Sequence, residues 1–149
     1  MTDKQPVNES DWDYLIVLDA CRYDEFENVY QEFFEGKLQK KISPGTGTAE
    51  WLYETFTSRY NYDYISANPF INSYGIPLNQ SFKGFDQKWN PTEKFRTIID
   101  SWDEDWDEEV DTVRPEDLTD RALQHETSRS TIIHYIQPHR PYISCPEEG

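Results

Sequence analysis

A carboxylate follows the most apolar stretch of the chain, in the segment YLIVLDACRYD at residues 14–24. Five strand-forming residues end at Asp19, and a helix-like sequence begins directly afterwards. An aspartate at this point can accept hydrogen bonds from the first amides of a helix, as an N-cap does. Its oxygens are also the ligands that a hard divalent cation prefers. Both alternatives, cap and metal ligand, stay open on this segment alone.

Two threonines lie in the segment SPGTGTAEWL at residues 43–52, where Pro44 and Gly45 interrupt the chain before a helical pattern. Thr46 or Thr48 can cap that helix. The start of a helix also attracts anions such as phosphate or sulfate, because its amides and its dipole present positive charge there. A hydroxyl at such a place can act as a nucleophile when a metal lowers its pKa. The segment lacks the Gly-Lys-Ser/Thr of a P-loop.

Two histidines accompany the last apolar segment, TIIHYIQPHRPY at residues 131–142. An imidazole can bind an oxyanion, donate a proton or ligate a metal. His134 is somewhat better explained as a hydrogen-bonded strand residue, whereas His139 stands between two prolines and is harder to explain as packing. Cys21 has no adjacent histidine to activate it and is interpreted as an inert thiol.

Alternating strand and helix patterns must position these side chains. We expect strands at residues 14–18, 37–43, 62–66 and 131–136, the first buried on both faces because it is apolar throughout. Amphipathic spacing predicts helices at 22–34, at 46–56 with a threonine cap, and at 115–126. We expect residues 69–90 to form a long loop with a short strand near 82–85, and residues 91–102 to be helical. The fold class is therefore α/β, with a mostly parallel sheet flanked by helices.

The carboxyl ends of parallel strands meet at one edge of the sheet, and ligands of such folds bind there. Asp19, the threonine segment and the two histidines all follow strand ends. We therefore expect them to share one site.

The charge of the chain excludes some partners. Its 149 residues carry 29 Asp and Glu against 14 Lys and Arg, a net charge of -15. Nucleic acids and anionic membranes select positive surfaces, so neither is an expected partner. A strongly acidic surface remains soluble at high salt, which favours a halophilic source. The sequence contains no signal peptide and no apolar span of membrane length, and its two cysteines form no disulfide framework, so we expect a cytoplasmic protein.

Together, YLIVLDACRYD, SPGT at residues 43–46 and HYIQPHRPY at residues 134–142 resemble the sulfatase-like branch of the alkaline phosphatase superfamily. The three segments have the order and spacing of that branch, and they look most like the sulfatase-like hydrolase/transferase proteins of haloarchaea. The resemblance implies the N-terminal part of an alkaline-phosphatase-like three-layer fold. It also implies hydrolysis or transfer of sulfate or phosphate esters with a divalent metal ion, Zn, Mn, Mg or Ca.

The resemblance implies a role for each matched residue. Asp19 would bind the metal, Thr46 would be the nucleophile and a metal contact, and Thr48 is the second choice as nucleophile. His139, in the PHRPY motif, would contact the substrate anion or its leaving group. The formylglycine motif Cys-x-Pro-Ser-Arg is absent, so a formylglycine sulfatase is not expected. Substrate binding is expected to involve four side chains, Arg22, His134, His139 and Arg140.

One departure from the family limits these expectations. The family completes its metal site with a downstream Asp-His-Gly block, which this sequence does not contain. We therefore expect residues 1–12 to be a polar N-terminal segment and residues 13–149 to be a partial domain with an incomplete metal site. The alternative function is a non-catalytic α/β domain, or a degenerate truncated homologue, that acts as a binding or scaffold module.

Overall fold

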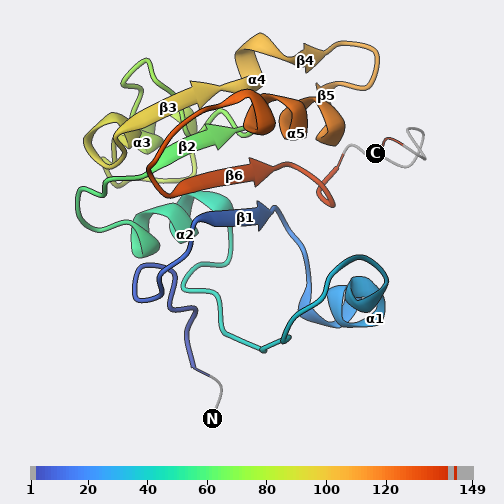
Figure 1. The fold of residues 1–149 in the computed structure, drawn as a ribbon. Helices are drawn as coiled ribbons and strands as arrows, with labels where there is room; N and C mark the ends of the chain where they lie inside the picture. Colours follow the sequence, from blue (N-terminus) through green and yellow to red (C-terminus); the bar gives the residue numbers. More distant parts are fainter. Residues whose placement is uncertain (1–2, 141–142, 144–149) are drawn as a thin grey trace.

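Four parallel strands form the central sheet of the protein, in the spatial order β1-β6-β2-β3 (Figure 1). The computed structural model describes residues 3–140 and 143. The strands are β1 (Tyr14–Leu18), β2 (Asp63–Ser66), β3 (Thr97–Asp100) and β6 (Thr131–Tyr135). The last strand in sequence, β6, lies between the first two, so Thr131 is opposite both Tyr14 and Asp63. The expected α/β fold with a parallel sheet is confirmed.

Helices cover both faces of this sheet. The longer helices are α1 (Tyr23–Phe33), α2 (Thr48–Thr55) and α5 (Pro115–Gln124), and the short ones are α3 (Leu78–Ser81), the 3-10 helix η1 (Pro91–Glu93) and α4 (Ser101–Glu104). A small antiparallel pair, β4 (Trp106–Asp107) and β5 (Thr112–Val113), precedes α5. No helix in the described part of the chain is long and apolar enough to cross a membrane.

Alternating side chains of the strands build two apolar layers. On one face, Tyr64 and Ile132 pack with Leu52 of α2 and with Phe56, which follows that helix. On the other face, their neighbours Ile65 and Ile133 pack with Leu118 of α5. Successive residues of a strand point to opposite faces, so adjacent residues of β2 and β6 serve different layers. The result is a three-layer arrangement, helix on sheet on helix.

The N-terminal segment lies against the first of these layers. Val7 and Trp12 pack on the α2 side of the core, and the Trp12 indole donates to the Val7 carbonyl at 2.8 Å. The Asn8 amide donates to the carbonyl of Thr55, the last residue of α2, at 2.6 Å. From residue 3 on, this polar segment is therefore attached to the domain.

Strand β1 differs from its prediction. Its bounds are those expected, but Tyr14 and Ile16 are 65% and 51% exposed, while Leu15 and Val17 pack against the core. The expectation that β1 is buried on both faces is wrong. The strand lies at the edge of the sheet, and α5 covers the strands beside it instead. Helix α1 was expected to bury an apolar side, but none of its residues is buried, and it stands apart from the sheet (Figure 1).

Three other expectations are wrong. Residues 37–43 form no strand, and only Ile42 makes an isolated parallel bridge, to Lys4. Residues 82–85 form no strand either, since α3 and a turn occupy this part of the loop. The expected helix at 91–102 is instead η1 followed by strand β3 and then α4. Three β-branched residues in succession, at 97–99, favour the strand.

The amino edge of the sheet is held by a buried ion cluster. The Asp63 side chain is fully buried at the start of β2 and accepts from Arg129 Nε at 2.7 Å. Its second oxygen lies 2.8 Å from His125 Nε2, just past α5, and Arg129 also donates to Thr97 Oγ1 at 3.2 Å on β3. This cluster ties β2, β3 and the segment before β6 together, at the edge opposite the candidate site.

Candidate functional site

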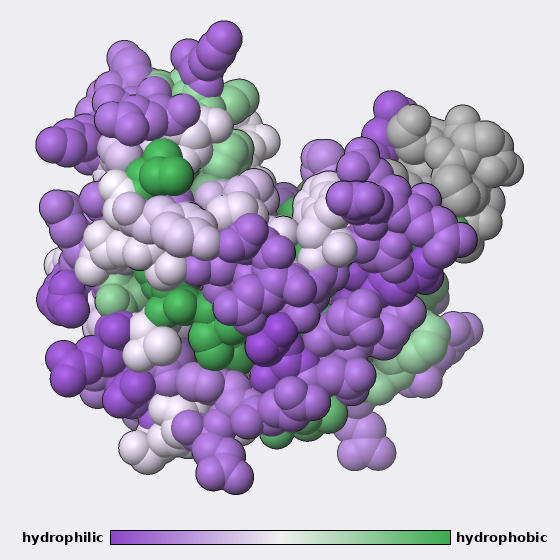
Figure 2. Space-filling view, turned by 90° about the horizontal axis from the view of Figure 1, so that it is seen from above, coloured by the Kyte–Doolittle hydropathy of each residue, from purple (hydrophilic) through white to green (hydrophobic). Residues whose placement is uncertain are grey.

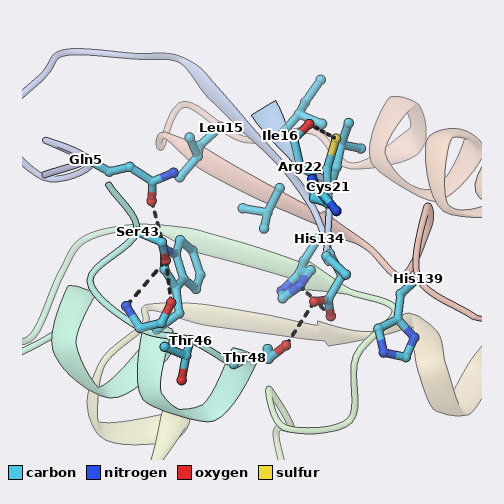
Figure 3. A pocket seen from close by; sticks show the side chains of 17 residues that line it. Gln5, Leu15, Ile16, Cys21, Arg22, Ser43, Thr46, Thr48, His134 and His139 are labelled. Carbon is cyan, nitrogen blue, oxygen red and sulfur yellow. Dashed lines mark hydrogen bonds and ion pairs between the residues drawn. The ribbon is translucent and has the colours of Figure 1, made fainter. Parts of the chain in front are cut away.

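A cleft of about 630 Å³ opens at the carboxyl edge of the sheet, beside the end of β1 (Figure 3). Its walls come from β1 and the turn after it, the loop that enters α2, and the end of β6. The lining residues are Gln5, 15–22, Ser43, 45–48, Trp51, His134 and His139. The three segments singled out in the sequence therefore contribute to one cleft.

Asp19 lies at the centre of the polar contacts in this cleft. Its backbone amide donates to the Tyr135 carbonyl at 3.2 Å, which continues the pairing of β1 with β6 by one residue. The chain then turns at Ala20, whose φ is 57°. Asp19 Oδ1 accepts from Thr48 Oγ1 at 2.9 Å, and Oδ2 accepts from Asn68 Nδ2 at 3.1 Å. Asp19 is therefore not the N-cap of α1, which begins after Arg22 with no side-chain cap.

His134 approaches the same carboxylate from β6. Its Nε2 lies 3.5 Å from Asp19 Oδ2, and its side chain is only 1% exposed. The other ring nitrogen, Nδ1, is 2.7 Å from the hydroxyl of Tyr64 on β2. No hydrogen bond to Nε2 is formed within the described residues. This nitrogen is thus buried and directed at Asp19.

The surroundings of Asp19 favour its charged form. Burial by itself would raise the pKa of Asp19, whose side chain is 14% exposed. The nearby His134 imidazole and the hydrogen bonds from Thr48 and Asn68 outweigh burial and lower the pKa below its ordinary value. A carboxylate with a lowered pKa is a weak general base and a good partner for a cation. Because burial and the nearby Asp19 charge raise the pKa of Tyr64 well above its usual value, this phenol keeps its proton.

The two threonines have different partners. Thr48 is the first residue of α2 and bonds to Asp19, whereas Thr46 donates both its backbone N–H and its hydroxyl to Glu50 Oε2, at 3.2 and 2.9 Å. These bonds lower the pKa of Glu50. The expected threonine cap is wrong. The N-cap of α2 is Gly47, which has no side chain that could accept from the helix amides. Thr46 lines the cleft, but Thr48 is the threonine in contact with Asp19.

Gly45 fixes the loop that carries both threonines. A Cβ on Gly45 would lie 2.4 Å from the backbone nitrogen of Trp51 and 2.7 Å from the carbonyl carbon of Glu50. The loop backbone therefore packs directly on the backbone of α2, at a distance that only glycine permits. This contact sets where Thr48 stands relative to β1.

The other predicted site residues are exposed. Arg22 lines the cleft but is exposed and paired with Asp24 at 2.8 Å. His139 lines the cleft after the cis Gln137-Pro138 bond, and its Nδ1 lies 2.8 Å from the carbonyl oxygen of the exposed Arg140. Cys21 also lines the cleft, where burial and the charge of Glu25 raise its thiol pKa, as an inert thiol requires. Three residues of the sequence argument, Pro141, Tyr142 and Cys145, lie outside the described residues.

Two residues at the site were missed from the sequence. Asn68 follows β2 at the same sheet edge, and Tyr64 lies inside that strand. The position of Asn68, two residues after a predicted strand, is the signal that could have identified it. Nothing in the sequence distinguishes Tyr64 from the other tyrosines, since its role depends on the pairing of β2 with β6.

The carboxylate of Asp19 and the hydroxyl beside it are the kind of oxygen ligands that a hard divalent cation prefers. A carboxylate and a hydroxyl lie 2.9 Å apart, and Asp19 Oδ1 keeps a second lone pair beside the bond that it accepts from Thr48. Mg²⁺ is commonly held by one or two carboxylates, with water and substrate oxygens completing its coordination. Within residues 3–140 and 143, no three or more His, Cys, Asp or Glu side chains form a group that could hold a metal ion.

Comparisons with known proteins identify no relative of this chain. No family model, curated protein or solved structure matches the chain. The resemblance to the sulfatase-like branch thus stays a prediction, based on the three segments that line the cleft.

Proposed function

We propose that the cleft binds an anionic ester, a sulfate or phosphate, and hydrolyses or transfers it with a divalent cation and a threonine nucleophile. The observation that carries the proposal is the 2.9 Å bond between Thr48 Oγ1 and Asp19 Oδ1 at the start of α2. It joins a nucleophile candidate to a charged carboxylate at a helix end that favours anions. Of the two threonines, this contact favours Thr48 as the nucleophile.

Each residue has its own role in the proposed reaction. Thr48 Oγ1 attacks the sulfur or phosphorus atom, and the bond to the ester alcohol breaks, so that the alcohol leaves with a proton. Water, or an acceptor alcohol, then releases the group from the threonine. A divalent cation held by the Asp19 carboxylate and the Thr48 hydroxyl would lower the pKa of that hydroxyl and offset the charge of the ester. His139, at the rim of the cleft, is the side chain we assign to the ester or its leaving group.

The charge on Asp19 supports a cation-dependent reaction over simple base catalysis. Thr48 and Asn68 donate to its oxygens, His134 lies beside it, and its pKa is lowered. A base with a lowered pKa has little affinity for the threonine proton. The same carboxylate attracts a divalent cation strongly.

Turnover of nitrophenyl phosphate, bis-nitrophenyl phosphate and nitrophenyl sulfate tests the proposal, with Mg²⁺, Mn²⁺, Zn²⁺ or Ca²⁺ added in molar KCl. We expect at least one ester to be cleaved in a cation-dependent way. Thr48→Val should lower kcat at least roughly a thousandfold, as expected for loss of a nucleophile. Thr46→Val is the matched control and should retain most of the activity, because Thr46 bonds to Glu50 instead.

Two results would contradict the proposal. If Thr48→Val turns over as fast as the unchanged protein, this threonine is not the nucleophile. If no ester is cleaved with any of the four cations, the hydrolase proposal fails for this chain.

A non-catalytic binding module is the second candidate, and one observation favours it. Large apolar side chains are exposed on β1 and α1, with Tyr14 at 65%, Ile16 at 51% and Phe33 at 73%. Such surfaces often mark contacts with other proteins. The face in Figure 2, by contrast, is largely hydrophilic. An inactive chain that forms a defined complex through β1 and α1 would support this candidate.

A further inference from the structure

The site contains a buried chain of three polar groups from three different segments. Tyr64 on β2, His134 on β6 and Asp19 after β1 follow one another, with contacts of 2.7 and 3.5 Å. Tyr64 is 0% exposed and His134 is 1% exposed. The rings of Trp51 and His134 form a T-shaped pair, with 6.3 Å between ring centres. The contact between Tyr64 and His134 is therefore buried in the protein.

The Tyr64 hydroxyl decides where the imidazole proton lies. Tyr64 keeps its phenol proton, and the single hydrogen-bond partner of that hydroxyl among the described residues is His134 Nδ1. A buried hydroxyl that fails to donate leaves a polar hydrogen unsatisfied, at a cost of about 1–3 kcal/mol. The hydroxyl therefore donates and Nδ1 accepts, so the ring proton of the neutral imidazole is on Nε2.

The carboxylate on the other side requires the same arrangement. Nε2 faces Asp19 Oδ2 at 3.5 Å, and this oxygen already accepts from Asn68. With its proton on Nε2, the imidazole presents positive charge to the carboxylate. With the proton on Nδ1, the Nε2 lone pair would face the negative oxygen, and the Tyr64 proton would have no acceptor. Tyr64 and Asp19, on the two sides of His134, therefore select the same tautomer.

We propose that Tyr64 holds His134 in the tautomer protonated on Nε2, and that His134 thereby acts as a positioning residue for Asp19. Thr48, Asn68 and His134 then direct three hydrogens at the two oxygens, which fixes the orientation of the carboxylate toward the cleft. Tyr64 acts through His134 and does not line the cleft itself. The consequence for cation binding depends on the function proposed above, whereas the tautomer does not.

The tautomer can be measured directly in the whole chain. Long-range ¹H–¹⁵N correlation spectra distinguish a protonated from an unprotonated nitrogen in each imidazole, and the sequence contains three histidines. His125→Gln and His139→Gln identify the other two by loss of their signals. At mildly alkaline pH we expect His134 to show a single pattern, with Nε2 protonated and Nδ1 accepting. A pattern with Nδ1 protonated would overturn the proposal without any variant of the core.

Variants test the role of Tyr64. Tyr64→Phe removes the donor to Nδ1, and we expect the His134 signals to move toward a mixture of tautomers. Tyr60→Phe is the matched control, because it removes a hydroxyl that contacts Asn8 in the same aromatic cluster. Unchanged His134 signals in Tyr64→Phe would refute the role of Tyr64.

Binding of Mn²⁺ tests the positioning of Asp19. Loss of a group that orients a metal ligand typically weakens binding by about 10–100-fold, so His134→Leu should lose at least about tenfold in affinity. His134→Gln offers an amide N–H in place of Nε2–H and should retain most of it. Equal losses in the two variants would overturn the positioning role. If the unchanged chain binds no Mn²⁺, the proposed function fails, and the spectra alone decide the present inference.

Discussion

Arg129→Met should destabilise the protein by breaking the buried ion cluster at the amino edge of the sheet. The substitution keeps an unbranched apolar side chain and removes the guanidinium that donates to Asp63 and Thr97. Asp63 is fully buried, so its carboxylate cannot recover water as a partner. Its remaining cluster partner is His125, at 2.8 Å.

The expected magnitude follows from this geometry. Removing one partner of a buried pair costs about 3–5 kcal/mol, because a buried charge is left uncompensated. Arg129 is 34% exposed and His125 stays in place, and both facts favour the lower end. We expect the free energy of unfolding to fall by about 3 kcal/mol. Arg59→Met is the control, since Arg59 is exposed and makes one long bond to Thr92, and it should cost less than about 0.5 kcal/mol.

The effect depends on pH with a defined sign. Burial would raise the pKa of Asp63, but the hydrogen bonds from Arg129 and His125 and the charge of Arg129 outweigh it and lower the pKa. A lowered pKa gives stability that is present above the unfolded value of about 3.9 and is lost as the pH falls through the folded value. The difference between the unchanged chain and Arg129→Met should therefore be full at neutral pH and shrink below about pH 4.

Urea unfolding at fixed KCl, followed by tryptophan fluorescence, measures these differences. Asp63→Asn combined with Arg129→Met should recover part of the lost stability, because no buried charge is then left unpaired. A loss below about 1 kcal/mol in Arg129→Met, or a loss that grows as the pH falls, would refute the reasoning.

Three further predictions concern the sheet, the site loop and the charge. Ile16→Thr should lower the free energy of unfolding by less than about 1 kcal/mol, and Ile133→Thr by at least about 2 kcal/mol. The two residues are register partners, but Ile16 is 51% exposed and Ile133 only 7%. Similar losses for both variants in urea unfolding would contradict the exposed face of β1. Gly45→Ala should cost about 1–3 kcal/mol by its backbone clash, while Gly47→Ala, with no atom within 4 Å, should cost much less; equal melting temperatures would show that the loop can move away. Raising KCl from about 0.1 to 1 M shortens the screening length from about 10 to 3 Å. Because the net charge is -15, this screening should weaken the repulsion between like charges and raise the melting temperature. A fall in the melting temperature would contradict the halophilic interpretation.

The strands that reach the site were predictable because their signals are local. Apolar runs marked β1, β2 and β6 within a residue of their ends, and the carboxylate after β1 was visible directly. Strand β3 was missed because its β-branched residues are flanked by residues spaced as in a helix. The exposure of Tyr14 and Ile16 could not be read from β1, since an edge strand and a central strand can carry the same apolar run.

By itself, the sequence determined the fold class, the acidic surface and the three segments that meet at the cleft. These depend on composition and on periodicity along the chain. Tertiary structure decided that β6 lies between β1 and β2, and this order brings Tyr64, His134 and Asp19 into one chain of contacts. It also decided which of two threonines, only two residues apart, contacts Asp19. Packing of Gly45 on α2 sets the position of the helix start, so Thr48 meets Asp19 while Thr46 turns to Glu50.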